Sequence, residues 1–243
     1  NRLAKQAAKV IGEEEGILAF DPSGFEKDGK KSSGIARQWL GRFGKVDNGQ
    51  VGMFLAYVTR KEHVLVNAKL FIPQEWNDDP ERCRRAKIPE TEYQTHKTHE
   101  HCLDMLDEQG ELLPHQWITG DDELGRSSGF RRALRKREEK YCLAVPSDTN
   151  VRDGEKGPLK MKLAVFHVPA RTERSKRSGN ESEWLIVVER PKGSGVQCDD
   201  YLSNAADGTS YDEFARVVLA SHRVEDCFRR AKGECGLADD QVR

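Results

Sequence analysis

The order of strand-like and helix-like segments constrains the fold of this chain most. A short apolar run at residues 17–20 ends at Asp21, and two longer apolar runs follow at residues 50–59 and 63–72. Only three polar residues separate the last two runs, so they predict a β-hairpin. Together with the first run, the hairpin predicts a three-stranded meander. Residues 22–48 are rich in Gly, Lys and Ser and predict a long loop.

Helix-like and strand-like segments alternate after this meander. Residues 96–109 predict a helix, residues 116–119 a short strand that leads into Asp121, residues 130–139 a basic helix and residues 141–145 another strand. The order strand, strand, strand, helix, strand, helix, strand is that of an RNase H-like fold, a mixed α/β sheet flanked by helices. Residues 210–236 predict a long final helix, for which Gly236 is a candidate C-cap.

The remaining segments give the expected domain organisation. Residues 1–15 predict an amphipathic helix with Leu3, Ala7, Val10 and Ile11 on one face, whereas residues 73–89 look irregular. Residues 151–206 contain strand-like runs at 159–168 and 183–189, a basic loop at 170–182 and a Gly-rich turn at 193–195. We therefore expect an N-terminal helix (1–15), the first part of the core (16–150), a β-rich insertion (151–206) and a C-terminal helix that completes the core (207–243).

Composition narrows the class of protein. Charged residues make up 33% of the 243 residues and hydrophobic residues 36%, with a formal net charge of −1, so a basic nucleic-acid surface would have to be local. The six cysteines form no CxxC pair, which favours reduced thiols in a cytoplasm. No apolar run approaches the roughly 20 residues of a membrane span.

Three carboxylates stand at positions suited to metal binding: Asp21, Asp121 and Glu225. If the strands that precede the two aspartates are neighbours, both side chains emerge at one edge of the sheet, and a helix packed on that sheet can present Glu225. Carboxylate oxygens are preferred ligands of hard divalent ions, and two Mg²⁺ ions about 4 Å apart catalyse phosphodiester cleavage and transfer. Asp122 is the main competitor of Asp121, although it would point away if the strand continued.

Several blocks of this chain resemble the DDE transposases of bacterial insertion sequences, with a β-strand insertion in an RNase H-like catalytic domain. Residues 16–27 (GILAFDPSGFEK) are similar to the first-aspartate block, with Asp21-Pro22-Ser23 where the family has Asp-Asp-Thr. Residues 30–50 resemble a glycine-rich block, FIPQEW a Leu-Pro-x-x-Trp element, and GDDELG the second-aspartate block. Glu225 and Lys232 match the family's glutamate and lysine, which have six residues between them.

The resemblance implies a DNA transposase that cleaves transposon ends and transfers strands into target DNA. It implies that Asp21, Asp121 and Glu225 bind two Mg²⁺ or Mn²⁺ ions and that Lys232 contacts a DNA phosphate. It further suggests a homodimer on double-stranded DNA and a bacterial cytoplasmic, nucleoid-associated protein. Ser221 and Val218 occupy the positions of the family's arginine and tyrosine, and Arg223 is a partial substitute. Two alternatives stay open: an endonuclease of the same fold that does not integrate, and a non-enzymatic DNA-binding relic or regulator.

Basic clusters and tryptophans offer further DNA contacts. Arg229 and Arg230 flank the Glu225 segment and are expected to contact phosphate, together with Arg223 and Lys232. Two other clusters, at residues 131–137 and 171–177, are equally compatible with solvated surfaces. Trp39, Trp76 and Trp117 could stack on an extruded base, but Trp117 is expected in the core because of its strand.

Overall fold

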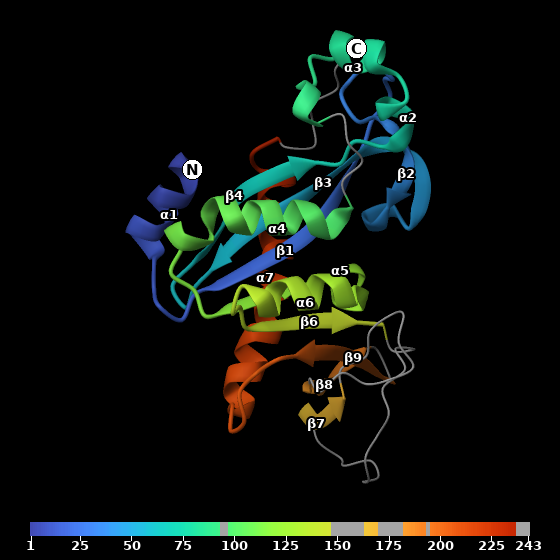
Figure 1. Cartoon of the computed structure of the whole chain (residues 1–243). Coiled ribbons are helices and arrows are strands. Elements are labelled where there is room, and N and C mark those ends of the chain that lie inside the picture. The colour runs from blue at the N-terminus through green and yellow to red at the C-terminus, as the bar shows by residue number, and fades with distance from the viewer. Residues whose placement is uncertain (93–96, 147–162, 170–181, 193–194, 237–243) are drawn as a thin grey trace.

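A computed structural model describes residues 1–92, 97–146, 163–169, 182–192 and 195–236 (Figure 1). These residues form one nine-stranded mixed sheet in the order β2-β3-β1-β5-β6-β9-β8-β7, and β4 also pairs with β3. The strands are β1 Ile17–Glu26, β2 Ala36–Leu40, β3 Lys45–Val58, β4 His63–Leu70, β5 Trp117–Gly120, β6 Tyr141–Val145, β7 Leu163–Pro169, β8 Ser182–Lys192 and β9 Gly195–Ser203. The α-helices are α1 Arg2–Ile11, α2 Gln74–Asn77, α3 Pro80–Arg85, α4 Thr98–Gln109, α5 Asp122–Arg126, α6 Ser128–Lys136 and α7 Tyr211–Gly233.

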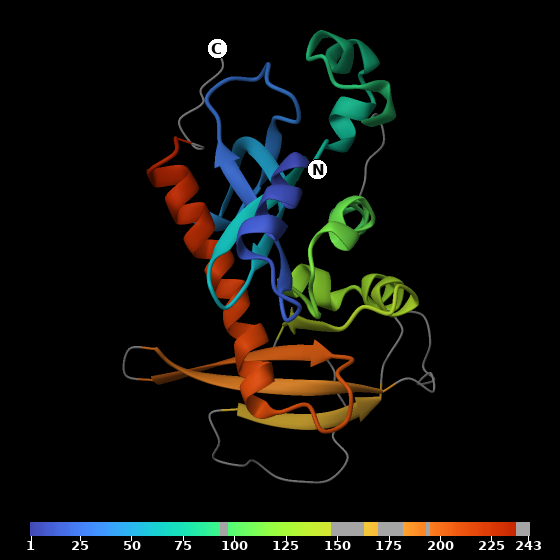
Figure 2. The ribbon, with the colours of Figure 1, turned by 90° about the vertical axis from the view of Figure 1, so that its left-hand side faces the viewer.

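Helices cover both faces of the sheet. Successive residues of a strand point to opposite faces, so Leu18 and Phe20 of β1 join a core with α1, α4, α5 and α6. Ile17 and Ala19 join a second core with α7. Figure 2 shows α7 crossing one face of the sheet while α1, α4, α5 and α6 lie on the opposite side. The expected fold, a mixed sheet flanked by helices with a long final helix, is confirmed.

The first strand is longer than its apolar run predicts. β1 continues through Asp21 to Glu26 and pairs antiparallel with β3 over its whole length. β2 and the start of β3 also lie within residues 22–48, so the prediction of one long loop there is wrong. Pro22 is tolerated in β1 because the pairing with β5 ends at Phe20, and no partner strand on that side needs the missing N–H. The predicted hairpin is confirmed as β3 and β4.

The segment after β6 extends the same sheet. β9 pairs antiparallel with β6, β8 with β9, and β7 with β8. Both predicted strand-like runs correspond to strands, β7 and β8, whereas β9 was not predicted because its first half is polar. Most of the basic loop at 170–182 and part of the turn at 193–195 lie outside the described residues. The expected domain boundaries stay predictions.

Three helical expectations need correction. α1 buries Ala4 and Ala7, whereas Leu3 and Val10 are exposed. The helix therefore packs against the core through its alanines, and the expected apolar face is only partly buried. Residues 73–89 contain α2 and α3, which are held by the buried side chain of Trp76. α7 begins after Ser210, whose hydroxyl accepts from the N–H of Glu213, and it ends at Gly233, three residues before Gly236.

Candidate functional site

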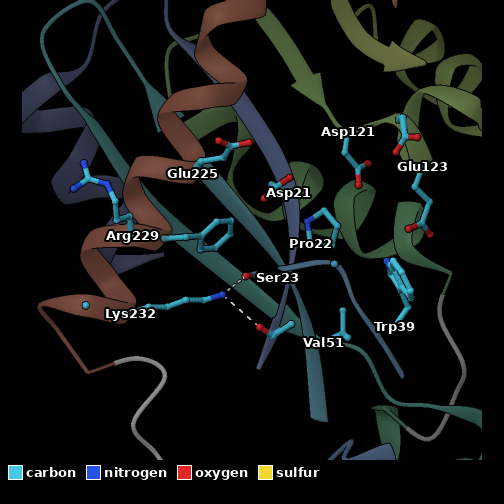
Figure 3. Close-up of a pocket in the computed structure, with 15 residues that line it drawn as sticks. Asp21, Pro22, Ser23, Trp39, Val51, Asp121, Glu123, Glu225, Arg229 and Lys232 are labelled. Carbon is cyan, nitrogen blue, oxygen red and sulfur yellow. Dashed lines mark hydrogen bonds between the residues drawn. The ribbon is translucent and has the colours of Figure 1, made fainter. Parts of the chain in front are cut away.

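A cavity lies at the edge of the sheet where β5 ends. Its volume is about 1010 Å³, and Asp21, Asp121 and Glu225 all line it. Asp21 lies between the other two in Figure 3. The cavity thus brings together side chains from β1, from the β5–α5 junction and from α7. Its wall also contains Pro22, Ser23, Gly24, Trp39, Gly41, Val51, Asp122, Glu123, Phe228, Arg229, Lys232 and Gly233.

The strand register places the two aspartates. Phe20 of β1 is paired with Gly120 of β5, so Asp21 and Asp121 each follow the last paired residue of parallel strands. Asp21 shares a face with Ile17 and Ala19, which pack toward α7. The expectation that both carboxylates emerge beside each other is met, although Asp21 itself lies within β1 rather than at its end.

Asp121 also caps a helix. Its side-chain oxygen Oδ1 accepts from the backbone N–H of Leu124 at 3.1 Å, as an N-cap aspartate does. Because β5 ends at Gly120, Asp122 begins α5 instead of continuing the strand. Asp122 therefore does not point away from the site but lines the cavity, as does Glu123, which the sequence did not single out. Glu123 accepts a 2.6 Å hydrogen bond from the hydroxyl of Thr98.

Glu225 and Lys232 lie on the same side of α7. Seven residues correspond to about two helical turns, so both side chains face the sheet edge. Lys232 Nζ donates to Ser23 Oγ at 2.6 Å and to the carbonyl oxygen of Gly24 at 3.3 Å (Figure 3). Ser23 is two residues after Asp21 on the same face of β1, a spacing that could have identified it from the sequence.

Burial and repulsion by neighbouring carboxylates raise the pKa values of both aspartates. The pKa of Asp21 rises from 3.8 to about 8, mainly because burial disfavours its charge, and then because Asp121 and Glu225 are negative neighbours. The pKa of Asp121 rises to about 7, again mainly through burial, although the hydrogen bond from Leu124 opposes the shift. A bound cation would supply the missing positive charge and would favour the ionised form of both carboxylates. The raised pKa values are therefore consistent with a cation site.

The remaining predicted DNA contacts separate into two groups. Arg229 lines the cavity and forms an exposed ion pair with Asp226 at 3.0 Å. Arg223 donates to the carbonyl oxygen of Thr59 at 3.2 Å and is not part of the cavity wall, and exposed Arg230 also lies outside it. The structure thus brings Lys232 and Arg229, but not Arg223 and Arg230, to the carboxylates.

The family positions that this chain does not match lie away from the cavity. Val218 is buried in the core between α7 and the sheet. Ser221 donates its hydroxyl to the carbonyl oxygen of Val218 at 2.7 Å. Neither side chain reaches the cavity wall.

The basic helix α6 is partly a structural element. Arg131 is buried and pairs with Glu183, and Arg135 contacts the same carboxylate. Arg137 forms a pair of 2.7 Å hydrogen bonds with Asp107. These ion pairs favour a structural role for those three side chains over DNA contact.

Of the three tryptophans considered for base stacking, Trp39 alone is exposed. Its side chain is 62% exposed, whereas Trp76 and Trp117 are buried, and Trp117 donates to Glu213 at 2.6 Å. Trp39 lines both the carboxylate cavity and an adjoining cavity of about 330 Å³ that contains Met53 and Phe71. The expected core position of Trp117 is confirmed.

The donor chemistry of the cavity fits divalent ions of the Mg²⁺ type. Asp21, Asp121 and Glu225 supply oxygen ligands, and Asp122 and Glu123 lie on the same wall. Among the residues that the structure describes, no three such groups are already close enough to hold one ion. A bound ion would therefore need side-chain rotations or water ligands, which Mg²⁺ commonly retains.

Comparison with known proteins supports a nuclease. No curated protein matches the chain. None of the helices within the described ranges has the length and apolarity needed to cross a membrane. The family model described as DDE superfamily endonuclease matches residues 1–177, which include Asp21 and Asp121 but not Glu225. With nearly three quarters of its length matched, this chain belongs to the DDE superfamily endonuclease family.

Proposed function

We propose that this protein is a DNA transposase that cleaves transposon ends and transfers the freed strands into target DNA. The observation that carries the proposal is the convergence of Asp21, Asp121 and Glu225 on one cavity. Membership of an endonuclease family supports a phosphodiester substrate in DNA. The cavity is open to the surface at exposed Trp39 and Arg229, so a DNA backbone could approach the carboxylates.

Asp21, Asp121 and Glu225 would hold two divalent ions. When bound, such ions activate an attacking oxygen and stabilise a leaving one. Asp21 lies between the other two carboxylates (Figure 3), and both of them raise its pKa. Water would attack the scissile phosphate first, and the released 3′-hydroxyl would attack the target strand later.

Lys232 would contact a phosphate beside the reacting centre. In the absence of DNA its ammonium group is held by Ser23 and Gly24 on β1, the strand that carries Asp21. A phosphate oxygen could replace these neutral acceptors, since an ionised acceptor makes a stronger hydrogen bond. Arg229 could add a second cation after leaving its exposed pair with Asp226, which contributes little to stability.

Cleavage of a labelled duplex that carries the element end, with Mg²⁺ or Mn²⁺, tests this proposal. The parent is compared with Asp121→Asn and Glu225→Gln, and Asp226→Asn serves as the matched control because Asp226 adjoins Glu225 but is absent from the cavity wall. We expect metal-dependent cutting by the parent and the control, and background cutting by the other two. Cutting that survives both changes would overturn the carboxylate assignment.

Two alternative functions differ from this proposal in measurable ways. An endonuclease without integration would cut but would not join the freed 3′ end to target DNA in a strand-transfer assay. A DNA-binding regulator is favoured by one observation: Val218 and Ser221, at the family's tyrosine and arginine positions, lie away from the cavity. A regulator would bind DNA without cutting it, and its binding would not need Asp121 or Glu225. The homodimer stays a prediction.

A further inference from the structure

A buried ion pair connects strand β8 to helix α6, which directly follows the short helix α5 that Asp121 caps. Glu183 of β8 is 2% exposed and Arg131 of α6 is 6% exposed. Arg131 Nε donates to Glu183 Oε1 at 2.8 Å, and the Tyr141 hydroxyl donates to the same oxygen at 2.5 Å. One nitrogen of Arg135 lies 3.3 Å from it as well. Glu183 therefore organises three donors in a region with almost no access to water.

Arg131 also holds the end of α5. Its Nη1 donates to the carbonyl oxygen of Gly125, in addition to the Nε bond to Glu183. The N–H of the same Gly125 donates to the carbonyl oxygen of Asp121 at 3.0 Å. The guanidinium group is thus linked to the backbone of Asp121 through one residue, Gly125, and its fork geometry permits the bonds to Gly125 and Glu183 at once.

Helix α5 needs such support because it has only five residues. A helix this short is not stable on its own in water. Its packing leaves little freedom: a Cβ at Gly125 would lie 1.8 Å from the carbonyl oxygen of Ala144 on β6, and Leu124 is fully buried. α5 is therefore fixed by backbone contact with β6 on one side and by Arg131 at its last turn.

We propose that Glu183 and Arg131 are positioning residues for Asp121, through the Arg131–Gly125 hydrogen bond and the turn of α5. This inference rests on the proposed function, in which Asp121 is a metal ligand. It gives the strands after β6 a role in the site although they contribute no residue to the cavity wall. Glu183 supplies the counter-charge that keeps the guanidinium group buried and directed toward Gly125.

Metal binding by the DNA-free protein is the direct test. Binding of Mn²⁺ is followed by the loss of the free-ion EPR signal, and the Mn²⁺ concentration for half-maximal cleavage is measured in parallel. Arg131→Lys retains the positive charge but not the two-armed fork. We expect it to weaken Mn²⁺ binding about tenfold, the size usual for residues that orient metal ligands. Asp107→Asn is the control, since it breaks the ion pair with Arg137 at the end of α6 and leaves the hydrogen bonds of Arg131 in place.

A double variant separates positioning from stability. Glu183→Met alone leaves a buried charge on Arg131 and is expected to lower the melting temperature strongly. Adding Arg131→Met removes that charge and should restore most of the melting temperature. It cannot restore the hydrogen bond to Gly125, so Mn²⁺ binding should stay weak in the double variant.

The outcomes distinguish this inference from the proposed function. If the parent cuts DNA, Asp121→Asn does not, and both Arg131→Lys and the double variant bind Mn²⁺ as the parent does, the ion pair only stabilises the fold and the inference is wrong. If Asp121→Asn cuts as well as the parent, the proposed function itself fails. Weakened Mn²⁺ binding in both variants with unchanged binding in Asp107→Asn would support the inference.

Discussion

Asp21 and Asp121 are the first residues beyond Phe20 and Gly120, the last pair that joins the parallel strands β1 and β5. This register brings two carboxylates to one cavity wall, and Glu225 reaches the same cavity from α7. Lys232 lowers the pKa of Asp21, but this effect is smaller than those of burial, Asp121 and Glu225, which all raise it. The electrostatic cost of this arrangement leads to the first two predictions.

Asp21→Asn should stabilise the metal-free protein at high pH. The pKa of Asp21 is about 8 in the folded chain and 3.8 in the unfolded chain, so the folded state binds the proton more tightly between these values. The stabilisation that the proton on Asp21 contributes is therefore fully present below about pH 4. It decreases as the pH rises and is lost once the pH has passed about 8. Since each pKa unit corresponds to about 1.4 kcal/mol, we expect the variant to gain several kcal/mol in the free energy of unfolding at pH 9 and nothing at pH 4.

Urea denaturation at both pH values checks this prediction. Asp47→Asn is a control for which the opposite sign is expected. The pKa of Asp47 is lowered, chiefly by its hydrogen bond with Lys45, so its charged form is stabilising. A loss of stability for Asp21→Asn at pH 9 would show that the carboxylate is stabilising and would contradict the prediction.

Divalent metal should stabilise the parent, and increasingly so at higher pH. Ions compete with protons for Asp21 and Asp121, whose pKa values are about 8 and about 7. We expect Mn²⁺ at 100 times its dissociation constant to add about 2.7 kcal/mol to the free energy of unfolding. Thermal melts with Mn²⁺ or EDTA at about pH 6 and about pH 8.5 test this. Glu225→Gln should lose most of the effect, and an equal shift in that variant would argue against its role as a ligand.

Lys232→Met should weaken DNA binding and reduce its salt dependence. Loss of one phosphate contact lowers the slope of log K against log salt by about 1. Arg229→Met should have a similar but smaller effect, whereas Arg223→Met should not change the slope, since Arg223 is bonded to the carbonyl oxygen of Thr59. Filter binding or fluorescence anisotropy across a salt series measures the slopes. Equal slopes for the parent and Lys232→Met would rule out a phosphate contact.

Trp39→Ala should weaken binding to DNA with unpaired ends more than binding to intact duplex. Stacking of a base on an aromatic ring contributes about 1–3 kcal/mol, and Trp39 presents most of its side chain at the cavity wall. Trp39→Phe should retain much of the affinity. Tyr211→Ala is a matched control, because Tyr211 is also exposed but lies at the start of α7 and outside the cavity wall. Equal losses for both DNA forms would indicate that Trp39 does not stack on a base.

Local patterns in the sequence determined much of the fold. The β3–β4 hairpin, β5, β6 and α7 follow from apolar periodicity and short connections, because these features depend on neighbouring residues. The three carboxylates could be selected from the sequence because Asp21 and Asp121 follow short apolar runs and Glu225 lies within the final helix. Resemblance to a transposase family added the spacing of Glu225 and Lys232.

Only the tertiary structure decided the features that depend on distant partners. β1 extends through Pro22 because β3 pairs with it, β9 forms a polar strand because β6 and β8 flank it, and Arg131 is buried because Glu183 meets it from 52 residues away. Local sequence patterns predict loops where Gly, Pro and Ser are frequent, and they predict that runs of charged residues lie at the surface. Long-range hydrogen bonds and ion pairs override those local preferences, since a buried backbone or charged group must find its partner wherever the fold supplies one.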